Sequence, residues 1–537
     1  MLGRAKAQGS LLEARVFDAH LLTRGSVYER LAEHGHEIIS DDDFAHCYSP
    51  STGRPSIPPS MMMRAVLLAT HDKCSDAEAS RRTRVDLDWK AALGVDRDFR
   101  GIAATTFSLF RARLVLHDAE RAVLEATVAK AVAAGVLKGK VTAIIDSSPV
   151  TGAGAVADTY RLVRKTMGRL ARAAGDAIDA DLAARVEALA AVKADINWHD
   201  PAVRKAHLGE LVAAAQALLE AVDIDDATVA EAAGLLAAIV DQDVVRDRDG
   251  RPEIRRGVAT DRVVSHSDPQ MRHGRKSASR RFDGHKLDVV SDEHSELVLD
   301  IDVRAGNAAD GDAAAPAVQR INDMFTAITE DSEADEEETG LRVATLVGDM
   351  AYSDGDVREA VEAAGAALVA KVPPTSNSGR FPKTDFVLDL DADTPAATCP
   401  ADVTTTTTVK TNDHKGRRTF AFAFPAATCA ACPLRQQCVK GNRGRKVTVS
   451  VHKRRIAAAR TAQTEDADTV ALLRARAKVE RKIDHLQDLG MRHARYRGRR
   501  KTRLQAVLAA IVANVNRLDV LGAFDTASSA PLMAQAA

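Results

Sequence analysis

The sequence has few aromatic residues and almost no net charge. Aromatic side chains make up only 4% of the 537 residues, which argues against a surface that stacks nucleic-acid bases in series. The 74 lysines and arginines nearly balance the 75 aspartates and glutamates, so the net charge is −1. A uniformly basic protein that coats DNA is therefore excluded, whereas charge segregated along the chain is not.

Long hydrophobic runs and a cysteine framework are also missing. No apolar run reaches the roughly 18 residues that span a bilayer, and the N-terminus lacks the apolar core and cleavage site of a signal peptide. We therefore expect a cytoplasmic protein without a membrane partner. Six cysteines do not form a disulfide scaffold in a chain of this length. Four of the six lie within 40 residues, which requires a separate explanation.

Residues 1–138 have the pattern of an all-helical module. A Pro-Pro pair precedes Ser60, which we expect to cap a helix with the sequence MMMRAVLLATHDKC. Ser75 and Glu78 have the spacing of a capping box, and a longer helical stretch follows over 105–137. This order resembles a helix-turn-helix module that binds DNA, although any small helical bundle gives a similar pattern.

The pattern from 139 to 521 is typical of an α/β domain. Buried-strand runs alternate with helices, an Ala-rich stretch at about 156–247 predicts a helical insert, and a second insert at about 372–450 contains cysteines. Without the inserts the predicted order is β-β-β-α-β-α-β-α, which is the order of an RNase H-like mixed sheet. We expect the last residues, 522–537, to be a disordered tail.

Three carboxylates stand where a metal site could form. Asp146 ends the run VTAIID and Asp349 ends the run VATLVGD, so both are predicted at the carboxyl ends of buried strands. Glu480 is predicted on a helix, one turn after Arg476. Three carboxylates from distant segments can hold two Mg²⁺ ions, which act together on the attacking and leaving oxygens of a phosphodiester.

Other interpretations of these acidic residues remain open, because an aspartate at a strand end is usually a turn or helix cap. Four more aspartates stand in comparable positions: Asp300, Asp302, Asp354 and Asp356. On the predicted helix, Asp484 and Asp488 share a face with Glu480 and could take its place.

Basic side chains are concentrated in two blocks. Residues 474–503 carry twelve Lys and Arg against three acids, and residues 270–286 carry six against one. This density fits contact with DNA phosphates, although a solvated basic face gives the same pattern. An acidic run at 330–338 offsets part of the charge and is expected to be a solvated loop. The predicted DNA-binding residues are Arg272, Arg275, Lys276, Arg280, Arg281, Lys286, Arg476, Arg481, Lys482, Arg495, Arg497, Arg499, Arg500 and Lys501.

The clustered cysteines are Cys399, Cys429, Cys432 and Cys438. The last three have the spacing C-x2-C-x5-C, and four thiolates can hold a structural Zn²⁺ ion tetrahedrally. His414 or His452 could replace one ligand, and free thiols are the alternative. We expect the two remaining cysteines, Cys47 and Cys74, in the core.

The chain resembles bacterial insertion-sequence DDE transposases with an RNase H-like catalytic domain. The matching stretches follow one another over nearly the whole chain: GRPSIPPSMMMRAVLL, TTFSLFRARL, IIDSSPVTGAGAVADTYRLVRK, DPQMRHGRKSASRRFDGHK, VGDMAYSDGD, CAACPLRQQC and VERKIDHLQDLGMRHARYRG. The resemblance implies that Asp146, Asp349 and Glu480 are the catalytic triad and hold two Mg²⁺ or Mn²⁺ ions. Two positions differ, because Leu473 stands where relatives often have Tyr and Gln487 where they often have Lys or Arg.

The resemblance also implies an activity and partners. We expect a DNA transposase that cuts double-stranded DNA at the terminal inverted repeats of its element and joins the ends to target DNA, as a homodimer associated with the nucleoid. Arg481 and Lys482 would make the phosphate contacts that Gln487 cannot make. Two alternatives remain: a non-catalytic repressor derived from a transposase, which needs no carboxylates, and a metal-dependent nuclease, which leaves hydrolysed rather than joined ends.

Overall fold

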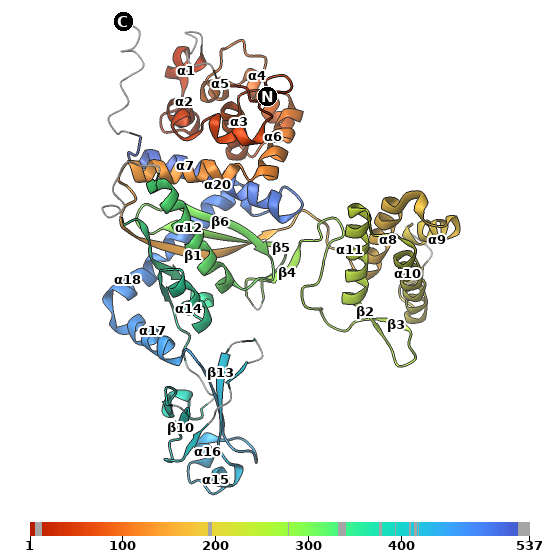
Figure 1. Cartoon of the computed structure of the whole chain (residues 1–537), viewed down its shortest axis with the longest axis vertical. Coiled ribbons are helices and arrows are strands. Elements are labelled where there is room, and N and C mark those ends of the chain that lie inside the picture. Colours follow the sequence, from red (N-terminus) through yellow and green to blue (C-terminus); the bar gives the residue numbers. More distant parts are fainter. Residues whose placement is uncertain are drawn as a thin grey trace.

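Figure 1 shows the computed structural model of the chain, in which a central mixed sheet connects several helical and β-rich parts. The described residues are 1–5, 13–191, 196–277, 279–330, 340–374, 379–392, 394–406, 410–412, 416 and 418–524. Nearly all of the expected acidic loop and most of the expected C-terminal tail lie outside these residues.

The N-terminal part is helical, as predicted. Its α-helices are α1 (Ala14–Phe17), α2 (Val27–Ile38), α3 (Pro59–His71), α4 (Asp76–Val85), α5 (Leu87–Leu93), α6 (Ala104–His117) and α7 (Glu120–Ala133). Ser75 caps α4, since its hydroxyl oxygen accepts a hydrogen bond of 3.2 Å from the backbone N–H of Glu78.

Two details of this part differ from the prediction. Ser60 is not a helix cap, because Pro59 already occupies the first turn of α3 and needs no hydrogen-bond partner for its nitrogen. The long helix expected over 105–137 is instead the pair α6 and α7. The break falls at Asp118, whose φ of 50° lies in the left-handed region.

The central sheet has the predicted RNase H-like character. Its strands are β1 (Lys140–Thr151), β4 (Arg272–Arg275), β5 (Arg281–Asp292), β6 (Val298–Ala305), β7 (Arg342–Gly348) and β8 (Ala367–Ala370). Their spatial order is β4-β5-β1-β7-β8, and β6 also pairs with β5. β1 is antiparallel to β5 but parallel to β7, which is itself parallel to β8. The sheet is therefore mixed, and the predicted α/β fold class is confirmed.

One strand boundary was predicted wrongly. The run VTAIID does not end β1 at Asp146, because the strand continues to Thr151. The long neighbour β5 provides the reason, since it pairs with β1 as far as the Thr151–Gly284 pair. Asp349 does follow the end of β7 directly, as predicted.

The C-terminal helices are α17 (Lys453–Glu465), α18 (Ala467–Ala475), α19 (Ala477–Leu486) and α20 (Arg499–Val520). The basic block at 474–503, which we expected to be a single helix, is not one continuous helix. Gly490 and Gly498 have φ values of 104° and 87°, and these left-handed residues separate α19 from α20. The basic block is thus divided between two helices and the loop that joins them.

Helix α20 lies between the sheet and the N-terminal helices (Figure 1), and it contacts β6 on one side and α2, α3 and α7 on the other. Its residues from Ala506 to Val515 are all buried, each with an exposed fraction of 2% or less. A helix that is apolar all round requires partners on all sides. Among the described helices, none has the length and hydropathy needed to cross a membrane.

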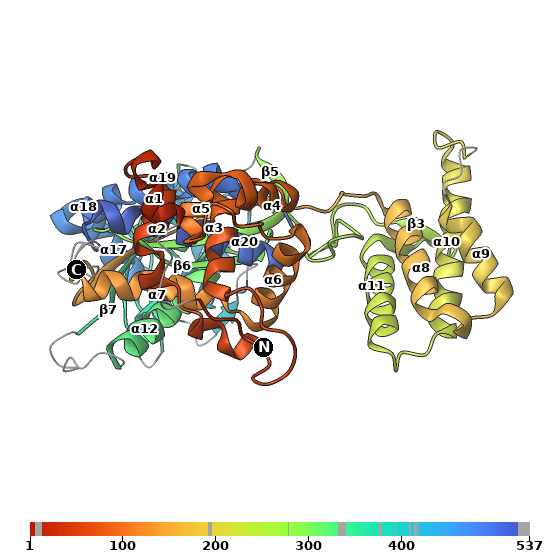
Figure 2. The same cartoon turned by 90° about the horizontal axis from the view of Figure 1, so that it is seen from above.

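Helices α12 (Ala314–Glu330) and α14 (Gly355–Ala363) pack against β7 and β8, respectively, and α19 packs against β1 and β5. The helical insert contains α8 (Thr159–Ala174), α9 (Ala180–Ala190), α10 (Pro201–Ala221) and α11 (Ala227–Asp243), followed by the hairpin β2 (Val244–Arg246) and β3 (Pro252–Ile254). These helices form a bundle with a hydrophobic core of its own, which stands beside the sheet (Figure 2).

The cysteine-containing insert is β-rich. It contains β9 (Val387–Asp389), β10 (Ala396–Thr398), β11 (Thr404–Thr406), β12 (Lys410–Asn412), β13 (Arg418–Ala423) and β14 (Lys446–Ser450), with α15 (Ala426–Ala430) and α16 (Arg435–Cys438). The first three strands form one sheet and the last three form another.

The buried amide of Asn514 allows a direct test of how α20 is held. Its Nδ2 donates to Thr127 Oγ1 and to the carbonyl of Val298, both at 2.9 Å, and its Oδ1 accepts from the backbone N–H of Val298 at 2.8 Å. We expect Asn514→Leu to lower the free energy of unfolding by about 2–4 kcal/mol, because buried polar groups lose their partners. Urea unfolding measures this loss. The control Val520→Ala, at an exposed site on the same helix, should change the free energy little, and an unchanged midpoint for Asn514→Leu would contradict the role of the amide.

Candidate active site

The three predicted catalytic carboxylates line one pocket with a volume of about 390 Å³. They come from separate elements, since Asp146 lies in β1, Asp349 follows β7 and Glu480 lies in α19. The other lining residues are Ser147, Ser148, Pro149, Arg275, Lys276, Phe282, Lys286, Asp310, Arg476, Ile483, Asp484 and Gln487.

The parallel pairing of β1 and β7 explains why two of the carboxylates meet. Its register places Ile144 opposite Val347, and Asp146 and Asp349 each follow two residues further along their strands. Side chains two residues apart leave a strand on the same face. Glu480 joins them because α19 packs on β1.

Arg476 links two of the carboxylates. Its Nη1 lies 3.4 Å from Asp146 Oδ2, and its Nη2 lies 2.7 Å from Glu480 Oε1. Arg476 and Glu480 are one helical turn apart and project from the same face, as their spacing predicted. The side chain of Asp146 is 17% exposed and that of Glu480 is 51% exposed, so the carboxylates extend from the pocket wall to its rim.

Burial, together with the negative charge of Asp349, raises the pKa of Asp146 to about 6. Three groups act in the opposite direction: the backbone N–H of Ser147, which donates to Asp146 Oδ1 at 2.7 Å, and the cations of Arg476 and Lys276. The raised pKa therefore reflects the burial of this carboxyl first and the charge of Asp349 second. A bound cation would favour the ionised form of the carboxyl.

Asp310 is a pocket residue that sequence reasoning missed. Its Oδ1 accepts hydrogen bonds of 2.7 Å from Ser147 Oγ and from Lys286 Nζ. Lys286 also donates to the carbonyl of Ala308 at 2.6 Å, so this lysine is engaged inside the protein. The sequence signal, an Asp-Gly-Asp turn before α12, looks like any helix start, and only the folded sheet brings it beside β1.

The alternatives to Glu480 on the same helix have different surroundings. Asp484 also lines the pocket, whereas Asp488 lies outside it and is 3.8 Å from Arg492. Gln487, at the position where relatives often have a basic residue, donates from Nε2 to Ser148 Oγ at 2.9 Å. This departure from the family pattern therefore stands in the wall of the pocket itself.

The other acidic candidates lie away from this pocket: Asp300, Asp302, Asp354 and Asp356. Asp300 is buried and pairs with Arg121 at 2.8 Å and Arg320 at 2.6 Å. Asp354 caps α14 by accepting from the backbone N–H of Asp356 at 3.1 Å, as expected of a helix cap.

Asp356, Glu359 and His452 place one ligand atom each within 4.8 Å of one another, as a metal site would. Arg418 already lies among them, 3.0 Å from Asp356, and it also pairs with Glu359. Arg455 adds a second cation 3.5 Å from Glu359. Because the two carboxylates are already paired with arginines, we interpret this group as an ion-pair network that fixes α14 to α17.

The predicted DNA-binding cations fall into groups. Arg275, Lys276, Lys286 and Arg476 line the pocket. Five more are exposed and form no ion pair with any residue in the described part of the chain: Arg280, Arg281, Arg497, Arg499 and Lys501.

The remaining predicted cations are engaged within the protein. Four of them form ion pairs, namely Arg272 with Asp261, Arg481 with Glu296, Arg495 with Asp76 and Arg500 with Asp118. Lys482 is 7% exposed, and burial lowers the pKa of its ammonium group to about 8. A buried ammonium group cannot reach a DNA phosphate, which removes Lys482 from the predicted set.

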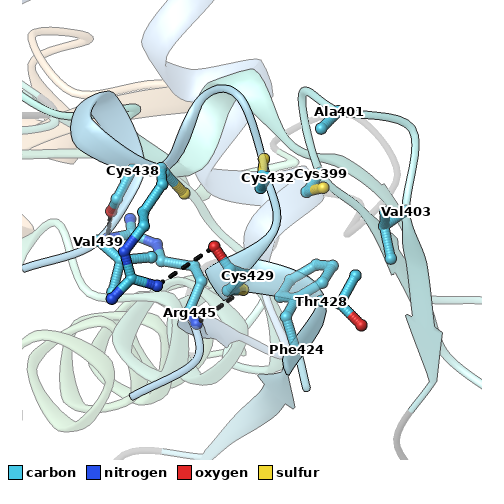
Figure 3. A pocket seen from close by; sticks show the side chains of 11 residues that line it. Cys399, Ala401, Val403, Phe424, Thr428, Cys429, Cys432, Cys438, Val439 and Arg445 are labelled. Atoms are coloured by element: carbon cyan, nitrogen blue, oxygen red, sulfur yellow. Dashed lines mark hydrogen bonds between the residues drawn. The ribbon is translucent and has the colours of Figure 1, made fainter. Parts of the chain in front are cut away.

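The four clustered cysteines line a second, smaller pocket in the cysteine-containing insert (Figure 3). Of the two histidines offered as replacement ligands, His452 instead pairs with Asp356 at 2.9 Å, and His414 lies outside the described residues. Cys47 and Cys74 are buried in the N-terminal core, as expected.

Two family models match the chain. One, described as Transposase domain (DUF772), covers residues 17–113, and the other, described as Transposase DDE domain, covers residues 398–519. The second range includes Glu480 and the four clustered cysteines. No curated protein and no solved structure matches the chain. The resemblance to insertion-sequence DDE transposases is confirmed by these two matches.

Asp146 should make stability depend on pH. Its folded pKa of about 6 lies above the ordinary carboxyl value, so the protein loses stability as pH rises toward 6 and this group ionises. The amide of Asp146→Asn does not titrate. The free energy of unfolding of this variant should therefore exceed that of the unmodified protein, by a difference that grows to about 3 kcal/mol above pH 6. Urea unfolding with chelator at about pH 4 and about pH 7.5 measures it. The exposed pocket residue Asp484, changed to Asn, is the control, and a pH-independent advantage for Asp146→Asn would contradict the assignment.

Proposed function

We propose that this chain, which carries transposase domains over 17–113 and 398–519, is a DNA transposase that cleaves double-stranded DNA at the ends of an element and joins them to target DNA. One observation carries the proposal: Asp146, Asp349 and Glu480, from three distant segments, line one pocket that also contains cations suited to phosphate. The N-terminal helical module would recognise the terminal inverted repeats. Because two ends must be joined, the acting species would be a homodimer on DNA at the nucleoid.

The donor set fits a pair of Mg²⁺ or Mn²⁺ ions. Both prefer oxygen ligands, which Asp146, Asp349 and Glu480 supply from the lining of one pocket. When bound, such ions would act as Lewis acids that activate the attacking oxygen and stabilise the departing oxygen of a phosphodiester.

The chain's own side chains would orient the reacting phosphodiester. Arg275 and Lys276 are exposed at the pocket and would contact its non-bridging oxygens. Arg476, now placed between Asp146 and Glu480, would turn toward the phosphate once those carboxylates have other cations. Asp310 would hold the β1 segment after Asp146 in place through Ser147.

The proposed chemistry consists of two displacements at phosphorus. In the first, the oxygen of water bonds to phosphorus at the element end, and the bond to the 3′-oxygen breaks, which leaves a free 3′-hydroxyl. In the second, that hydroxyl oxygen bonds to a target phosphorus and displaces the target's own 3′-oxygen. The proton released by each attacking oxygen goes to solvent or to a carboxylate, and each leaving oxygen takes up a proton.

The proposed DNA surface extends onto the helical insert, which the sequence did not indicate. Arg161 and Lys165 are exposed on α8 and lie near His266, as does Arg497 of the catalytic part. Burial lowers the pKa of His266, and these three cations lower it further. We propose that Arg161, Lys165 and Arg497, which come from distant parts of the sequence and all lie near His266, contribute to one basic surface.

Hydrogen bonds fix this surface in place. The backbone N–H of Ala157, just before α8, donates to the carbonyl of Val264 at 3.0 Å. The backbone N–H of Gly498, just after Arg497, donates to Asp268 Oδ2 at 3.0 Å. The segment that contains His266 is therefore tied to the insert at one end and to the basic loop before α20 at the other.

Glu480→Gln tests the catalytic assignment. We expect cleavage of DNA that carries the element ends to fall by at least about a hundredfold, because a charged ligand is replaced by a neutral amide. Binding measured by gel mobility shift without divalent metal should change little. Asp488→Asn, two residues beyond the end of α19 and outside the pocket, is the matched control. Cleavage that survives in Glu480→Gln would overturn the assignment, and hydrolysed but never joined ends from the unmodified protein would indicate a nuclease.

The division between unpaired and paired cations gives a second test. Replacing Arg497, Arg499 and Lys501 together with Ala should weaken DNA binding and reduce the slope of log affinity against log salt by about one unit for each lost phosphate contact. The control variant replaces Arg495 and Arg500, which already pair with carboxylates, and should change the slope less. Equal slopes in the triple variant and the unmodified protein would place the DNA elsewhere.

A further inference from the structure

The cysteine-containing insert has little hydrophobic core with which to stabilise itself. Its described strands are three to six residues long, and its buried hydrophobic cluster contains these residues: Phe386, Ala397, Phe420, Phe422, Phe424, Cys438, Val447 and Val449. A β-rich unit of this size with so small a core usually requires a disulfide or a metal ion for stability. All four cysteines of the cluster are free thiols, so disulfides do not supply it.

The four cysteines come from two parts of the insert whose strands belong to separate sheets. Cys399 follows β10, in the turn that leads to β11, where its backbone N–H donates to the carbonyl of Val403 at 2.9 Å. Cys429 lies in α15, Cys432 just after it and Cys438 at the end of α16. A ligand held by all four would therefore join the first sheet to the segment between β13 and β14.

The four side chains surround one space (Figure 3). Its volume of about 30 Å³ is sufficient for a single ion. Among the described residues, the sulfurs do not meet the 4.8 Å spacing that marks the Asp356 group. Each sulfur follows Cβ directly, so rotation about the Cα–Cβ bond changes its position without moving the backbone.

The surroundings of the sulfurs match those of a metal-bound thiolate cluster. The backbone N–H of Arg445 donates to Cys429 Sγ at 3.4 Å. Arg435 and Arg445 both line the pocket, and their guanidinium groups donate to the carbonyls of Cys429 at 3.3 Å and Cys438 at 3.1 Å. One divalent ion leaves four thiolates with excess negative charge, which these two cations would offset.

We propose that Cys399, Cys429, Cys432 and Cys438 bind one structural zinc ion, which holds the two parts of the cysteine-containing insert together. Thiolate ligands select zinc over magnesium, because soft sulfur donors favour the softer ion. Four protein ligands close the coordination shell, so this site has a structural and not a catalytic role. The inference is independent of the proposed DNA chemistry, because the ion touches none of the pocket carboxylates.

Metal analysis of the purified full-length chain tests the site directly. We expect one zinc ion for each chain, and replacement by Co²⁺ should give the absorption bands of tetrahedral thiolate coordination. Cys432→Ser should lose the ion and the bands, whereas the control Cys74→Ser, in the N-terminal core, should keep both. Iron in place of zinc, a chain without metal, or full zinc retention in Cys432→Ser would overturn the proposal.

Limited proteolysis tests what the ion does. Removal of zinc by a chelator should increase cleavage within 372–450 by at least about tenfold, because the insert then opens locally. The sheet that contains β1 and β7 should remain intact under the same conditions. Added zinc should restore resistance in the unmodified protein but not in Cys432→Ser. Equal cleavage with and without zinc would overturn the structural role of the ion.

Discussion

The parallel pairing of β1 with β7 is the interaction on which the candidate active site depends. It converts two aspartates that are far apart in sequence into neighbours, and it leaves their side chains on one face of the sheet. Like charges brought together in this way repel each other. The fold tolerates this because many buried contacts fix the two strands, while Arg476 offsets part of the charge.

Helix α20 connects this site to the N-terminal module. Its apolar length is buried between the sheet and the N-terminal helices, and the basic residues around its start are divided between two tasks. Arg495 and Arg500 pair with acidic groups of the N-terminal module and help to hold it. Arg497, Arg499 and Lys501 have no such partner among the described residues and remain available to a polyanion. One short segment thus combines a structural role with a binding surface.

Much of this architecture could be predicted from the sequence. The RNase H-like order, the two inserts, and the positions of Asp349 and Glu480 followed from hydrophobic periodicity and from the family resemblance. The predictions that failed concern features that depend on contacts with residues distant in the sequence. β1 extends past Asp146 because β5 pairs with it, and Lys482 is buried because α19 packs on the sheet. Asp310 and Arg161 carry no local signal, since only the fold brings them to their sites.

The base of the helical insert has a consequence for how such chains can change over time. The chain segments that leave and re-enter the central fold are joined by the hydrogen bond from Ala157 to Val264, and the bundle beyond them has its own core. Closure of a longer loop costs little additional entropy once its ends are fixed. Evolution is therefore free to lengthen, shorten or exchange the bundle while β1 and Asp146 keep their positions. The number of residues between the first two carboxylates is then a poor guide to kinship, whereas the geometry of the strands that carry them is a good one.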